Sequence, residues 1–158
     1  MKNIVKIFAL MFTLIQVTNA ATPTLPCLFS FAPNKTVTLK ASTSVVLELN
    51  QRFTADEVKE GTTLKFIVRA DVMSEGKVVI KTGALAIGRV NYVKAATYND
   101  KAEVGIELRQ VKAVDGQMVD LDGNLSIING ENPNEGLTAY AGKGLTAQVL
   151  NDINIKAE

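Results

Sequence analysis

The residue types that most often carry chemistry are scarce in this chain of 158 residues. Histidine is absent and cysteine occurs once, at Cys27. Without histidine the chain lacks the commonest general base, the commonest metal ligand and every Ser–His or Cys–His nucleophile pair. Zinc, haem and copper sites are therefore not expected. The sequence predicts a protein that is not an enzyme and that has no cofactor.

Oxygen-bearing side chains around two turns form a weak candidate for a metal site. Asp115, Asp120, Asp122 and Asn124 lie close together in the sequence, and such oxygen atoms are the ligands that Ca²⁺ prefers. The EF-hand pattern is not met, because no glutamate occupies its closing position. Asp-Gly pairs also favour turns without any metal, and we prefer that interpretation.

Two further patterns leave an enzymatic alternative open. Lys81-Thr82-Gly83 matches the K-T-G triplet of serine β-lactamases, although the companion S-D-N motif is absent. The chain also contains 16 Asp and Glu residues, and a pair of carboxylates is sufficient for glycoside hydrolysis. No particular pair stands out, so a carboxylate-dependent hydrolase remains an alternative function.

The N-terminal residues predict export. Lys2 and Lys6 precede an apolar run at residues 7–17, and the small residues Thr18 and Ala20 follow it. This order is typical of a secretory signal peptide, which we assign to residues 1–20. The run is shorter than the ~20 apolar residues that span a bilayer. We expect a periplasmic or extracellular protein with no integral membrane segment after cleavage.

Residues 21–35 are expected to form an extended arm, because they contain three of the four prolines. The arm is too apolar for a free linker, so it should contact the domain or a neighbouring molecule. Contact with a neighbour would make it a site for a protein partner or for self-association. Cys27 could be a free thiol, a crosslink or a lipid anchor. The candidate interaction residues are Leu25, Cys27, Leu28, Phe29 and Phe31.

Residues 36–158 are predicted to form a single all-β domain. Apolar residues alternate with polar ones, as in Val45, Leu47 and Leu49, which is typical of strands with one buried face. Many short strands separated by turns predict a small antiparallel β-barrel or a barrel-like sandwich. Two exceptions are expected: a short helical turn from Thr54 to Glu57, and a long mobile loop or flap at residues 129–144. The expected strands cover residues 37–39, 45–49, 64–68, 78–80, 84–92, 104–111, 119–121, 125–127 and 145–149.

Glycines are expected to be structural at turns and at close contacts between strands. Gly83 should end one strand, and Gly88 should lie inside the next, where glycine marks a bulge or a close backbone approach. The other glycines with an expected structural role are Gly61, Gly76, Gly116 and Gly123. The charge balance is near neutral, with 17 Lys and Arg against 16 Asp and Glu. A nucleic-acid partner is therefore not expected.

The order of features between residues 40 and 123 resembles a known family. The matching segments are residues 39–43, 49–56, 64–68, 71–72, 76–84, 86–90, 106–108, 114–116 and 119–121. Together they are similar to the C-terminal β-barrel domain of channel-forming proteins of bacterial type IV secretion and conjugation systems, and to related small exported bacterial β-domains. The resemblance implies a barrel and supplies no catalytic residues.

The function that these patterns predict is non-enzymatic. We expect an exported scaffold or binding domain of the bacterial envelope, or a secreted one. An accessory component of a secretion or conjugation apparatus is the first alternative, because of the resemblance. The carboxylate-dependent hydrolase is the second.

Overall fold

The computed structural model describes residues 35–157, which form thirteen β-strands and no helix. The proposed signal peptide and residues 21–34 of the predicted arm lie outside the described residues. The strands are β1 (Lys35–Leu39), β2 (Ser44–Leu49), β3 (Phe53–Thr54), β4 (Thr63–Val68), β5 (Val72–Ser74), β6 (Lys77–Ile80), β7 (Leu85–Lys94), β8 (Lys101–Lys112), β9 (Met118–Asp120), β10 (Leu125–Pro133), β11 (Thr138–Ala139), β12 (Gly144–Gln148) and β13 (Ile153–Ala157).

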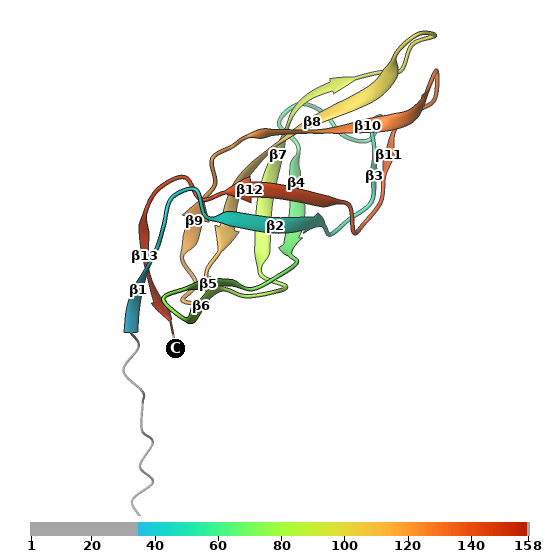
Figure 1. The fold of residues 1–158 in the computed structure, drawn as a ribbon. Coiled ribbons are helices and arrows are strands. Elements are labelled where there is room, and N and C mark those ends of the chain that lie inside the picture. Colours follow the sequence, from blue (N-terminus) through green and yellow to red (C-terminus); the bar gives the residue numbers. More distant parts are fainter. Residues whose placement is uncertain (1–34, 158) are drawn as a thin grey trace, which may run out of the picture. The chain divides into compact units, whose positions relative to one another are not determined.

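Seven of these strands form one antiparallel sheet. Its order is β10-β8-β7-β4-β2-β12, with β9 paired to β8 beside β10. The sheet curls into a half-barrel (Figure 1). An isolated antiparallel bridge between Leu121 and Val149 joins the β9 side of the sheet to the β12 side. The prediction of an all-β, barrel-like antiparallel fold is confirmed.

The core lies on the concave face of this sheet and is apolar. Every second residue of β2 and β4 is buried, because successive side chains of a strand point to opposite faces. Leu47, Phe66, Ile106 and Leu108 have no exposed surface, and no polar or charged residue of the described part is buried. The alternation in the sequence therefore reflects one buried and one solvated face.

Three small two-stranded sheets complete the domain. β1 pairs with β13, β5 with β6 and β3 with β11, all antiparallel. The β5–β6 turn is tight, with positive φ angles of 48° at Glu75 and 76° at Gly76. β13 also contacts β6, so the first two of these sheets lie together at one end of the domain (Figure 1).

Two of the predicted local structures are wrong. Residues 54–57 form a hydrogen-bonded turn rather than a helical one, although the expected contact between the Thr54 N–H and the Glu57 carboxylate is present at 2.8 Å. Residues 129–144 are not a long loop. β10 continues through Pro133, and β11 pairs with β3, so strand pairing occupies much of this glycine-rich stretch.

Gly88 lies at a bulge between β7 and β8 and at a close contact between strands. A Cβ atom at this position would lie 2.8 Å from Cε2 of Phe66 and 3.3 Å from the carbonyl oxygen of Glu107. Gly83 differs, because it has a φ of +82° and open space around it. Glycine is required at position 88 because a side chain would clash with its neighbours, and at position 83 because the backbone has a positive φ. Positive φ angles also occur at Gly61, Gly76, Gly116 and Gly123.

Candidate functional site

The end strands of the main sheet leave an opening, which we call the seam. β10 and β12 each pair with a neighbour on one edge. The bridge between Leu121 and Val149 joins the two sides at one end. Two hydrogen bonds flank it: the Asp122 N–H donates to the Gln148 carbonyl (2.8 Å), and the Leu150 N–H donates to the Asp120 carbonyl (3.0 Å). Beyond this contact, no strand among residues 35–157 fills the gap.

The backbone of β12 presents hydrogen-bonding groups to the seam. The Val149 N–H donates to the Thr43 carbonyl and the Lys143 carbonyl accepts from Leu49, each at 2.9 Å, so odd-numbered residues of β12 face β2. Backbone groups alternate in direction along a strand. Gly144 and Thr146 therefore direct their N–H and C=O groups into the seam. Such an unpaired row is a template for an added extended chain.

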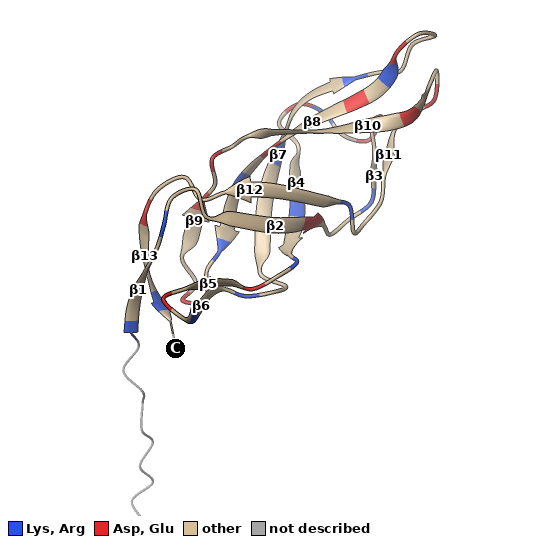
Figure 2. Ribbon diagram, in the orientation of Figure 1, with Lys and Arg blue, Asp and Glu red and all other residues tan. Residues whose placement is uncertain are grey.

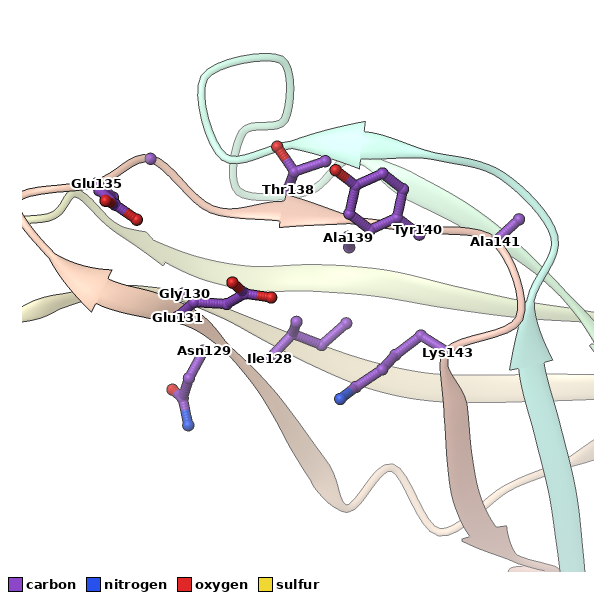
Figure 3. A pocket seen from close by; sticks show the side chains of 11 residues that line it. Ile128, Asn129, Gly130, Glu131, Glu135, Thr138, Ala139, Tyr140, Ala141 and Lys143 are labelled. Atoms are coloured by element: carbon purple, nitrogen blue, oxygen red, sulfur yellow. The ribbon is translucent and has the colours of Figure 1, made fainter.

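A groove of about 430 Å³ lies at the wide end of the seam, between β10 and the segment that contains β11. Ile128 and Ala139 are buried and contribute apolar surface to it. Glu131 and Lys143 extend into the gap from opposite sides (Figure 3). The remaining lining residues are Asn129, Gly130, Glu135, Gly136, Thr138, Tyr140 and Ala141. The groove thus combines apolar surface with polar groups.

Tyr140 provides an exposed aromatic surface on the wall of the groove. Its side chain is 66% exposed, and the guanidinium carbon of Arg52 lies 5.8 Å from the ring centroid. At this distance the cation and the ring face attract each other weakly. Tyrosine offers an apolar body and a polar tip, which suits a protein-binding surface.

The carboxyl groups with shifted pKa values serve turns outside the groove. The pKa of Asp71 is lowered mainly by hydrogen bonds from the backbone N–H and hydroxyl of Thr82. The pKa of Asp152 is lowered by Lys40 and by the Ala41 N–H. Each hydrogen bond favours the charged carboxylate. These groups hold loops together as anions.

The structure does not bring the four candidate calcium ligands together. Asp115 accepts hydrogen bonds from the backbone N–H of Gln117 (3.1 Å) and of Lys156 (2.9 Å). Burial alone would raise the pKa of Asp115, but these bonds together lower it. Asp120 pairs with Gln110 across the strands, and Asp122 accepts from the amide of Asn124. Within residues 35–157, no group of three His, Cys, Asp or Glu side chains is placed to hold a metal ion.

The triplet Lys81-Thr82-Gly83 forms a turn in which Thr82 donates to Asp71, at 2.6 Å from its backbone and 2.7 Å from its hydroxyl. Serine β-lactamases also carry an S-x-x-K motif, and Ser74 and Lys77 have this spacing. In this structure the two residues lie on either side of the β5–β6 turn. The Ser74 hydroxyl donates to the Thr38 carbonyl at 2.6 Å. Both patterns are explained by local structure.

Sequence reasoning missed the groove. The candidate interaction residues Leu25, Cys27, Leu28, Phe29 and Phe31 all lie outside the described residues. The groove residues fall in the stretch that was expected to be a loop, and its glycines and polar residues hid the strands. The period-two pattern of Leu125 and Ile127 correctly indicated a strand but the wrong buried face, because these side chains are 46% and 50% exposed and Ile128 is buried instead.

Two further findings concern the chain as a whole. The sequence matches no protein-family model and no curated relative. The structure contains no helix within residues 35–157 that is long and apolar enough to cross a membrane.

Proposed function

We propose that this chain is an exported, non-enzymatic binding or scaffold domain that takes up an extended protein segment at the seam. The observation that carries the proposal is the unpaired backbone edge of β12, which faces β10 across an opening in the sheet. An extended chain that enters such a gap gains main-chain hydrogen bonds from the edge and side-chain contacts from the groove.

The chemistry of the groove favours binding over catalysis. Its lining contains no serine, cysteine or histidine. The two carboxylates that a hydrolase would use here are Glu131 and Glu135, and the Glu135 carboxylate accepts a local hydrogen bond from the Asn132 side chain at 2.9 Å. Most of the surface that lines the groove is polar, and Ile128 and Ala139 contribute a small apolar part that an extended segment could contact.

A protein is the favoured partner because charges of both signs occur along the domain (Figure 2). A stripe of positive charge, which would favour a nucleic acid, is not a feature of this distribution. The barrel-like fold also agrees with what the resemblance to type IV secretion channel domains implies. An accessory role in a secretion or conjugation apparatus is therefore one setting in which the seam could act.

Photo-crosslinking in the producing cell tests the proposal. We would place p-benzoylphenylalanine at Thr146, which lies on the seam edge, and at Lys65 as the control. Lys65 is also exposed, but it lies on β4, which is paired on both edges. A discrete protein adduct from position 146 and none from position 65 is expected. Equal adducts, or none from position 146, would contradict the proposal.

Export is tested separately by intact-mass analysis of the protein recovered outside the cytoplasm. The proposed signal peptide predicts a chain that begins at Ala21. A chain that begins at Cys27 with added lipid mass would show an anchored protein instead, and a full-length mass would argue against cleavage.

A further inference from the structure

We infer that the seam of one copy of this chain binds residues 25–31 of a second copy. The inference rests on the proposed function, because it names the occupant of the same seam. The two surfaces involved are an unpaired strand edge and an apolar segment that precedes β1.

The pattern of residues 25–31 matches a strand. Leu25, Cys27, Phe29 and Phe31 occupy alternate positions, so an extended backbone places all four on one face. No charged residue occurs between residues 21 and 31. Seven residues in a strand span ~23 Å, and the five of β12 span ~17 Å. The segment is thus long enough to pair along the whole of β12.

The groove offers open space beside that face, and its lining surface is mostly polar with a small apolar part. Among its lining residues, Ile128 and Ala139 are at most 4% exposed, and Gly130 has no side chain. Small residues at the base leave the volume of about 430 Å³ open. This volume is within the range of about 300–1,000 Å³ that is usual for ligand pockets. Aromatic side chains from an added strand would fill space that the chain's own residues leave empty.

Chain length argues for a second copy. β1 starts at Lys35, at the end of the domain away from β10 and β11 (Figure 1). Four residue steps separate Phe31 from Lys35, and they reach at most ~14 Å. β1 alone spans ~17 Å, and it and β2 both lie between Lys35 and the groove. The segment therefore cannot bind its own domain in an arrangement that places Phe31 in the groove. A neighbouring molecule can present the whole segment.

The resulting contact is head-to-tail. Each copy contributes one segment and one seam, and the two surfaces differ, so the interface is heterologous. Repetition of such a contact closes into a ring or continues as a fibre, depending on the rotation between copies. This would make the domain a building unit of a larger assembly.

Disulfide trapping tests the inference, because Cys27 is the sole cysteine. Thr146→Cys and Asn129→Cys place a second thiol on either side of the seam, and Lys65→Cys is the control. For each variant, nitrogen-15-labelled and unlabelled full chains are mixed in equal amounts and oxidised with glutathione disulfide. Linked peptides are then identified by mass spectrometry.

Linked peptides of mixed label that join Cys27 to position 146 or 129, at a yield at least tenfold above the control, are expected. Links that are exclusively of a single label would show that the segment occupies its own seam, which overturns the inference and leaves the proposed function standing. No link above the control also overturns it. A foreign protein crosslinked at Thr146 would then identify a different occupant.

A proline variant provides a second, independent readout. Thr146→Pro removes an N–H that faces the seam, and it spares the hydrogen bonds of β12 to β2, which come from the odd-numbered residues. Thr146→Ala keeps the N–H and is the matched control. Light scattering should show assemblies for the alanine variant and monomers for the proline variant, with similar melting temperatures. Equal masses for the two variants would overturn the inference.

Discussion

Leu121 pairs with Val149 at the point where the β9 side of the sheet meets β12. Both side chains are buried, at 4% and 2% exposure. The bridge closes the half-barrel at one end, and β10 and β12 remain unpaired with each other beyond it. This pair therefore determines where the closed part of the domain stops and where the seam starts.

The first prediction concerns the two leucines on either side of this transition. Leu121→Ala should lower the free energy of unfolding by ~2–4 kcal/mol, because it leaves a cavity beside the bridge. Leu125 lies four positions along and is 46% exposed, so Leu125→Ala should change stability by less than ~1 kcal/mol. Urea denaturation of both variants measures the difference. Equal losses would contradict the assigned burial.

Gly88 should not tolerate a side chain. In Gly88→Ala the new methyl group meets the ring of buried Phe66, and we expect a loss of ~1–3 kcal/mol from overpacking. Gly136→Ala is the control, because a Cβ at that position meets no atom within 4 Å. Thermal unfolding of both variants is the measurement. An unchanged melting temperature for Gly88→Ala would show that the β4–β7–β8 contact is misplaced.

Gly83 should respond to backbone preference instead of volume. Its φ of +82° is costly for a β-branched residue, and Gly83→Val should destabilise the protein by ~1–2 kcal/mol. Asparagine adopts positive φ more readily, so Gly83→Asn should lose less than half as much. A larger loss for asparagine than for valine in the same denaturation experiment would contradict this explanation.

Stability should fall in acid. Asp71, Asp115 and Asp152 have pKa values below the ordinary 3.8 in the folded protein. Their contribution is complete above the unfolded pKa and is lost as the pH falls through the lower folded values. Melting temperatures between about pH 6 and pH 2 should therefore decline below about pH 4.

The control for this acid dependence is Asp71→Asn. It keeps an oxygen that accepts the hydrogen bonds of Thr82 but removes the titration. Its melting temperature should fall less steeply in acid than that of the unaltered protein, although it starts lower. Parallel curves for the two proteins would show that Asp71 does not contribute to the acid dependence.

The strands with one buried face were predictable from the sequence, because alternation survives in β2, β4, β8 and β12. The strand β13 was missed, although Ile153 and Ile155 alternate in the same way. Its partner β1 is separated from it by most of the chain, and a short pattern at the C-terminus gives no hint of that pairing. Non-local pairing is a property of the fold and not of local residue preference.

Dipeptides that favour turns indicated where the chain bends, but they did not indicate which strands pair after the bend. Glu75-Gly76 forms the expected hairpin turn. Asp122-Gly123 looks the same in the sequence, but the flanking strands β9 and β10 both pair with β8 and not with each other. A dipeptide specifies a bend, whereas tertiary contacts decide which strands meet after it. The seam depends on this choice and so could not be predicted from the sequence.

Amide hydrogen exchange at Thr146 shows directly whether an added strand occupies the seam. The Ala147 N–H is bonded to β2 and should be protected at every protein concentration, so it is an internal control. We expect protection of the Thr146 N–H to rise as the concentration of the full-length chain rises, because an added strand then occupies the seam. Exchange of Thr146 as a free edge amide at all concentrations, beside a protected Ala147, would contradict this expectation.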